Sequence, residues 1–167
     1  MKSIFNIFFC SIILCSFSQC SSAQKLQDNA PIEYGEVYFQ KWVAGIQGGG
    51  SGLDLYVTKV HKKQNIEFDS VYFRGKVAKL EYRLESKILE GSFSTIFNKK
   101  QDVILSDKPK GEFGNEAPII PKKIPFDLKD NECVISYKYR SIIKYFKIEN
   151  IKEKQMLSYP SAPPNKQ

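Results

Sequence analysis

The stretch Cys133-Val-Ile-Ser-Tyr-Lys-Tyr-Arg-Ser-Ile-Ile-Lys-Tyr-Phe-Lys-Ile148 decides the fold that the sequence predicts. Two runs of β-branched and aromatic residues, 133–139 and 142–148, flank Arg140-Ser141, and two residues are the length of a tight hairpin turn. Neither turn residue is the glycine that such turns prefer, so the register stays open. Alternation divides the first arm into two faces. The residues on the core side are Cys133, Ile135, Tyr137 and Tyr139. The residues on the solvent side are Ser136, Lys138 and Arg140.

Runs with the same period of two recur along most of the chain. Helical periodicity is weak throughout the chain. The best candidate helix, 79–90, has no cap residue, and Gly91 is its one stop signal. Short strands with little helix between them predict an all-β single domain, an antiparallel β-sandwich or small barrel. We expect strands at 33–43, 53–60, 66–74, 76–84, 88–97, 102–105, 133–139, 142–151 and 155–159.

The N-terminal segment Met1–Ala23 has the order of a signal peptide: Lys2, an apolar run, then small residues before the cut. The run is too short and too interrupted for a membrane-spanning helix. Cleavage after Ala23 predicts an exported protein of the periplasm or the extracellular space. The alternative is cleavage before Cys20, which would then carry a lipid anchor, although Gln19 is a poor match to the lipoprotein pattern. Membrane attachment is expected only in that alternative.

The segments that follow divide into one domain and two tails. We expect a flexible lead-in at 24–31, a β-sandwich domain at 32–158 and a disordered proline-rich tail at 159–167. Within the domain, 106–123 has the composition of a long loop, and its acids lack the spacing of a calcium site.

Cysteine usage and charge exclude several classes of function. Three of the four cysteines lie in the leader, so the exported chain keeps only Cys133 and can form no internal disulfide. Cys133 lies within a strand pattern and is expected to be a small buried hydrophobic residue. A catalytic thiol would need a base nearby, and the one histidine, His61, lies in a polar turn. The net charge is +7, with lysines spread over the chain, which predicts no nucleic-acid partner for an exported protein. No residue pattern predicts a metal site or a cofactor.

The glycine cluster Gly45–Gly52 resembles a motif but fits no catalytic template. Leu53 and Asp54 follow it where a phosphate loop needs Lys-Ser or Lys-Thr, and Leu53 also stands where the dinucleotide fold and the nucleophile elbow need glycine. The cluster therefore predicts a permissive loop or a surface that accepts a partner.

A candidate binding site adjoins this loop. Alternation over 33–43 places Val37, Phe39 and Val43 toward the core and aromatic residues with Gln40 on the other face. Aromatic rings between hydrogen-bonding groups are suited to a protein or glycan surface. The competing interpretation, which we favour, is that both faces of this strand are buried in a sandwich and that Trp42 belongs to the core. The candidate binding residues are Tyr34, Tyr38, Gln40, Trp42, Gly48, Gly49, Gly50 and Ser51.

Tyr38–Gly52, Glu132–Tyr137 and the ending Tyr159-Pro160-Ser161 together resemble small exported proteins of flavobacteria and related Bacteroidota, for which no activity is known. The resemblance implies a Gram-negative cell envelope and no substrate or cofactor. We therefore expect a non-enzymatic envelope protein that binds a protein or glycan. The alternative is a secreted hydrolase that uses strand carboxylates as general acid and base. The carboxylates considered are Glu33, Glu36, Asp54, Asp69 and Glu81.

Overall fold

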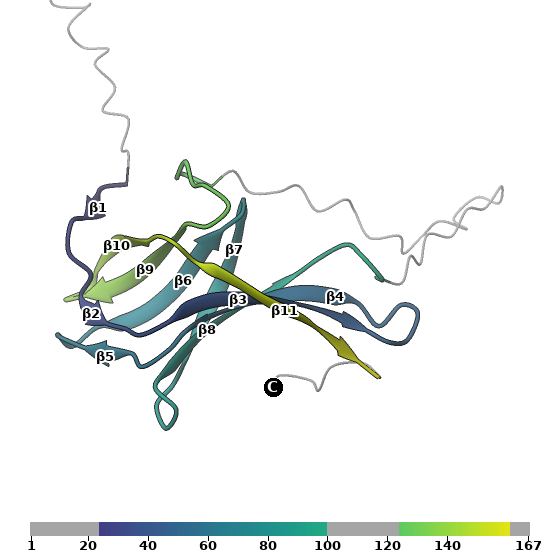
Figure 1. The fold of residues 1–167 in the computed structure, drawn as a ribbon. Coiled ribbons are helices and arrows are strands. Elements are labelled where there is room, and N and C mark those ends of the chain that lie inside the picture. The colour runs from purple at the N-terminus through teal and green to yellow at the C-terminus, as the bar shows by residue number, and fades with distance from the viewer. Residues whose placement is uncertain (1–23, 100–123, 161–167) are drawn as a thin grey trace, which may run out of the picture.

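The computed structural model describes residues 24–99 and 124–160, which form one all-β domain (Figure 1). The predicted fold class is confirmed. Among the described elements there is no helix that could span a membrane. Several sequence predictions concern residues outside these ranges: the leader 1–23 with Cys20, the strand 102–105, the loop 106–123 and the tail beyond Pro160.

The described residues form eleven strands. Nine of them make one sheet in the order β1-β10-β9-β6-β7-β8-β4-β3-β11, while β2 and β5 pair separately. The inner pairs are antiparallel, whereas the outermost pairs, β1 with β10 and β11 with β3, are parallel. The strands are β1 (Leu26–Gln27), β2 (Ile32–Glu33), β3 (Val37–Ala44), β4 (Ser51–Val57), β5 (His61–Lys62), β6 (Glu67–Phe73), β7 (Lys76–Arg83), β8 (Ile88–Ser94), β9 (Cys133–Tyr139), β10 (Ile142–Ile148) and β11 (Lys152–Tyr159).

The long sheet folds into two layers along β7. The first half of this strand, Lys76–Lys79, pairs with β6, and the second half, Leu80–Arg83, pairs with β8. The layers are in tight contact at Gly91 of β8, where a Cβ atom would lie 2.5 Å from Cγ1 of Val71 in β6. Glycine is required at this corner because any side chain would push the layers apart.

Apolar side chains of both layers form the core. Phe39 of β3 lies 5.3 Å from Phe73 of β6 between ring centroids, and Leu55 of β4 is fully buried. Burying a side chain of this size stabilises the fold by about 1.5–3 kcal/mol. The alternation predicted for 33–43 and 53–60 is thus realised, with Phe39 and Leu55 facing inward.

Tight turns with two central residues of positive φ connect two pairs of strands. The predicted hairpin of β9 and β10 is confirmed, with Ile142 paired to Tyr139 and φ of 48° at Arg140 and 66° at Ser141. The β6–β7 turn has the same form, with φ of 47° at Arg74 and 74° at Gly75. Both have the backbone of a type I′ turn, which matches the twist of the strands even where glycine is absent.

The prediction that Ser136 faces solvent is wrong, because both faces of β9 are covered. Ser136 has no exposed surface, and its Oγ donates a hydrogen bond of 2.9 Å to Asp69 at the irregularity in β6. On this outer face Phe126 packs against Tyr72 and Tyr145, with centroids 5.0 and 5.3 Å apart. The segment before β9 therefore returns over the sheet and excludes water from it.

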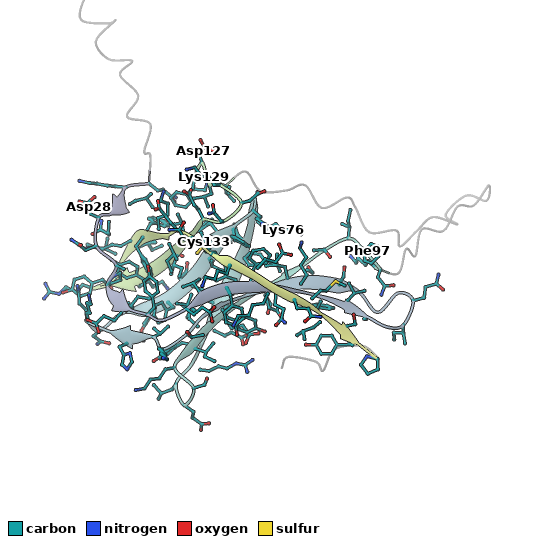
Figure 2. All side chains as sticks on the ribbon, in the orientation of Figure 1. Asp28, Lys76, Phe97, Asp127, Lys129 and Cys133 are labelled. Carbon is teal, nitrogen blue, oxygen red and sulfur yellow. The ribbon has the colours of Figure 1, made fainter. Side chains whose placement is uncertain are left out.

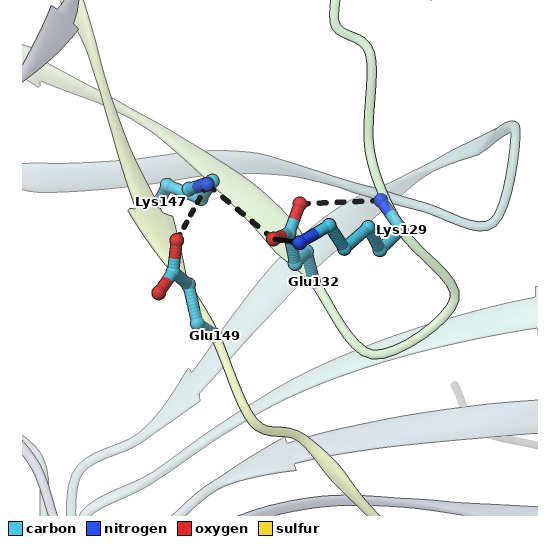
Figure 3. A network of polar contacts seen from close by, with 4 residues as sticks. All are labelled: Lys129, Glu132, Lys147 and Glu149. Carbon is cyan, nitrogen blue, oxygen red and sulfur yellow. Dashed lines mark hydrogen bonds and ion pairs between the residues drawn. The ribbon is translucent and has the colours of Figure 1, made fainter.

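Polar contacts hold this returning segment in place (Figure 3). The buried carboxylate of Glu132 accepts a hydrogen bond of 3.2 Å from the backbone N–H of Lys129 and lies 3.4 Å from Nζ of Lys147 in β10. Lys147 also pairs with Glu149 at 2.5 Å. These contacts, the backbone donor first, lower the pKa of Glu132 below its usual 4.5.

Strand pairing reaches residues of both segments that the sequence predicts as tails. In the lead-in expected to be flexible, Leu26 and Gln27 pair with Tyr145 and Phe146 of β10. At the other end Tyr159 is the last residue of β11, which has an irregularity between Lys154 and Leu157. Backbone pairing to a neighbouring strand thus includes Leu26, Gln27 and Tyr159 in the sheet.

Candidate binding site

A hollow of about 520 Å³ opens where β7 and β8 separate. Beyond the pair Leu80 and Gly91, β7 follows β6 while β8 continues beside β4 as far as Ser94. The core side of β3, β4 and β8 therefore extends past the rim of the other layer, and β3 and β4 project to the right in Figure 1. The lining residues are Lys41, Trp42, Val43, Ser51, Gly52, Leu53, Phe73, Arg74, Lys76, Phe93, Thr95, Phe97 and Met156.

The lining is mainly apolar. Val43 and Leu53 come from the projecting strands, Phe93 from β8, and Phe73 from the opposite layer. Phe73 and Phe93 have centroids 6.2 Å apart. Further hydrophobic side chains lie exposed near this end, including Phe97, which is 66% exposed. Apolar surface gathered at one end of a soluble domain is typical of an interaction site.

Trp42 is half-buried at the edge of the hollow, which differs from both interpretations of the sequence. Its indole lies against Gly52, the residue paired with it in β4, where a Cβ atom would come within 2.6 Å of the ring. Tyr159 of β11 meets the indole edge-on, 6.3 Å between centroids. Because Gly52 has no side chain, the indole of Trp42 can pack directly over it. The tryptophan therefore lines the hollow without being part of the closed core.

Other aromatic residues of β3 contact neighbouring strands. Tyr38 packs on Tyr56 with centroids 5.1 Å apart, and Nζ of Lys154 lies 3.5 Å from the Tyr38 ring centroid. Gln40 donates a hydrogen bond of 2.6 Å to the carbonyl of Gln155. Tyr38 and Gln40 are absent from the residues that line the hollow.

Tyr34 belongs to a different region from the rest of the predicted site. It precedes β3, and its pKa is raised by partial burial and then by Cys133 and Glu149. Tyr34 lies before the start of β3, whereas Trp42 lies near the end of that strand, and Tyr34 does not line the hollow.

The predicted glycine loop is tied down by Asn98, which the sequence analysis did not identify. The Asn98 side chain donates to the carbonyls of Ala44 and Ile46, both at 2.9 Å, and its Oδ1 accepts from the N–H of Gly48 at 2.9 Å. The N–H of Gly50 donates to the Asn98 carbonyl at 2.7 Å. The loop therefore has a defined shape that depends on a residue far away in sequence.

Ser51 is the member of the predicted glycine site that lines the hollow. Its buried Oγ donates a hydrogen bond to the carbonyl of Phe97 at 2.5 Å and contacts the hydroxyl of Thr95. These contacts fix the segment after β8 against the start of β4, which positions Phe97 at the hollow. Gly48, Gly49 and Gly50 shape the adjoining loop and are not lining residues.

Three cations lie among the lining residues. The guanidinium carbon of Arg74 lies 4.3 Å from the centroid of Phe39, and Nζ of Lys76 donates a hydrogen bond of 2.7 Å to the carbonyl of Ser94. Lys41 pairs with Glu153 of β11 at 2.7 Å. Sequence reasoning missed Arg74 and Lys76, although the Arg-Gly pair before 76–84 is a signal for the turn that places them.

The strand carboxylates considered for a hydrolase line no part of the hollow. Asp54 is buried beside Tyr56, whose pKa is raised by burial and by the charges of Asp54 and Glu90. Glu90, also buried, pairs with Arg83 at 2.6 Å. Three of the other candidates have partners elsewhere: Glu33 with Lys63, Glu36 with Lys154, and Asp69 with Ser136. Glu81 lies exposed on β7.

Cys133 is fully buried, as expected. Burial raises the pKa of its thiol to about 12, so the thiol stays protonated at neutral pH and is a poor nucleophile. Exposed His61 instead contacts the Lys59 carbonyl at 2.8 Å. Within residues 24–99 and 124–160, no three His, Cys, Asp or Glu side chains gather as a metal site.

These contacts define a preformed apolar hollow with cationic side chains, built from β3, β4, β8 and the β6–β7 turn. No protein-family model, curated protein or solved structure matches the chain. Functional inference therefore depends on the chemistry of this hollow.

Proposed function

We propose that the protein is a non-enzymatic binding module whose ligand enters the hollow between β7 and β8. The single observation that carries this proposal is an open apolar cavity of about 520 Å³ beside the packed core. Small-molecule sites in proteins span about 300–1,000 Å³ and are lined mainly by apolar side chains. The leader adds the second part of the proposal, which is that binding takes place in the cell envelope after export.

The composition of the hollow narrows the partner. A glycan site needs several free polar side chains that can satisfy sugar hydroxyls, whereas this lining is mainly apolar and its polar residues Lys41, Ser51 and Thr95 already have partners in the fold. The earlier expectation of a protein or glycan partner is therefore narrowed to a ligand with an apolar portion. The hydrolase alternative receives no support, since the considered carboxylates lie outside the hollow.

A neutral hydrophobic dye, N-phenyl-1-naphthylamine, tests this proposal. The protein is expected to bind the dye saturably at one site, and Phe97→Ser is expected to weaken binding about five- to tenfold, because one aromatic contact is lost. Phe97 is exposed, so the substitution leaves the core intact. Fluorescence titration measures the affinity, and circular dichroism checks the fold.

Ile142→Ser is the matched control, since Ile142 is 61% exposed beside the β9–β10 turn and does not line the hollow. It should leave dye binding unchanged. Linear, unsaturable dye uptake, or an equal loss of affinity in both variants, would show that the hollow is not the site.

A further inference from the structure

The hollow combines an apolar interior with positive charge, which indicates a particular ligand chemistry. Resting on the proposed function, we propose that the ligand is a single-chain fatty carboxylate, with its acyl chain against the apolar lining and its carboxylate beside Arg74 and Lys76. Both cations belong to β7 or to the turn before it, and the projecting strands supply most of the apolar surface. Figure 2 shows Lys76 and Phe97 on the same side of these strands.

Arg74 is positioned for an anion. Its turn holds it beside Phe39 and Phe73, whose ring centroids lie 4.3 and 5.4 Å from the guanidinium carbon. Nε donates to the carbonyl of Asp130 at 3.0 Å. Within the described ranges this is the one hydrogen bond that the guanidinium makes, which leaves its terminal N–H groups for the fork geometry that carboxylates accept.

Lys76 adds a second positive charge. Its ammonium group donates to the carbonyl of Ser94 and has two further donors. No carboxylate of residues 24–99 or 124–160 lies within 4 Å of the charged nitrogens of Arg74 or Lys76, whereas Lys41 has Glu153. Among the described residues, the lining cations without an acidic partner are therefore Arg74 and Lys76, and their positive charge favours an anionic head over a neutral or cationic one.

The size of the hollow favours one acyl chain over a membrane surface. About 520 Å³ within a fold suits a monomeric ligand that enters from solution, while attachment to a bilayer would use a broad basic surface. Burial of the chain predicts that each added methylene tightens binding about fourfold until the hollow is full.

The test uses protein purified from cells that express the full sequence and compares three ligands with the same dodecyl chain: laurate, dodecanol and dodecyltrimethylammonium. Below micelle-forming concentrations, titration calorimetry should show laurate binding at least about tenfold more tightly than dodecanol, and the ammonium most weakly. Lys76→Gln should reduce this preference for laurate over dodecanol severalfold, and Arg74→Gln combined with Lys76→Gln should abolish it.

Arg140→Gln is the matched control, because Arg140 occupies the equivalent place in the other turn and lies near the ring of Tyr139. It should keep the full preference for laurate. Lys76→Gln changes an exposed side chain, so it keeps the test valid if the double variant fails to fold.

Each outcome separates the two proposals. If all three ligands bind with the same affinity, the proposal of an anionic head group is wrong, while the hollow remains the binding site. If none binds, both proposals fail. A preference lost equally in Arg140→Gln reflects net charge and overturns the assignment to Arg74 and Lys76. If the protein binds vesicles of phosphatidylglycerol and does not bind free laurate, the fatty-carboxylate proposal is overturned and the partner is a membrane surface.

Discussion

The two halves of β4 show the contrast between the closed and the open end of this sandwich. Leu55 pairs with Phe39 and Gly91, and Val71 of the other layer packs directly against Gly91. Leu53, two residues earlier and on the same face, lines the hollow. Both leucines are buried, so alternation determines which side chains point inward, while the separation of β7 from β8 determines which of them also border the hollow.

The largest expected effect compares these two leucines. Leu55→Ala should lower the free energy of unfolding by about 3–4 kcal/mol, since it leaves a cavity in closely packed core. Leu53→Ala should cost less than half as much, because water and side chains can fill the enlarged hollow. Urea unfolding monitored by circular dichroism measures both. Equal losses would mean that the hollow is closed in solution.

A second prediction tests the corner where the layers meet. Gly91→Ala should destabilise the protein by about 1–3 kcal/mol, because the new methyl group has no room beside Val71. In a Val71→Ala background the same substitution should cost clearly less, which a double-mutant cycle measures. Additive losses in the cycle would argue against direct contact between these residues.

A third prediction compares the turns at the two ends of the domain. Ser141 has φ of 66°, so Ser141→Gly should stabilise the protein by about 1 kcal/mol. Gly75 has φ of 74° with free space around it, and Gly75→Ala should destabilise by a similar amount. Thermal unfolding would show shifts of opposite sign. Shifts of the same sign would contradict the assigned turn geometry.

The smallest expected effect concerns how stability depends on acid at Glu132, which holds the segment that covers the outer face of the sheet. Because the folded pKa of Glu132 is lowered, its contribution is complete above the usual value of 4.5 and is lost as pH falls through the lowered pKa. Glu132→Gln should therefore lower the urea midpoint at pH 7 and make it less sensitive to acid below pH 4.5. Exposed Glu85→Gln serves as the control. If Glu132→Gln leaves the acid dependence of the urea midpoint unchanged, Glu132 does not contribute to stability in this way.

Most of the fold could be predicted because each strand has its own local signal. The runs 133–139 and 142–148 alternate, are rich in β-branched and aromatic residues, and pair across a two-residue turn. Burial of Cys133 followed from the same alternation. Ser136 could not be assigned in this way, since its burial depends on Phe126, which covers the outer face from a segment without strand pattern.

The candidate site was only partly accessible from sequence. Trp42 and Ser51 were identified and do line the hollow. Arg74, Lys76 and Phe93 were not, because the site depends on how one strand divides its hydrogen bonds between two layers. Asn98 was missed for a similar reason, as its partners lie about fifty residues earlier in the chain.

The irregularity of β11 has a consequence for self-association. This strand is an edge of the sheet, and an exposed edge with free backbone groups is a template for pairing with another copy of the chain. The break in register between Lys154 and Leu157 interrupts that template, and the charged residues Lys152 and Glu153 precede it. At the other edge β1 has only two residues. The domain thus carries open apolar surface at one end while its sheet edges resist the aggregation that such surface would otherwise promote.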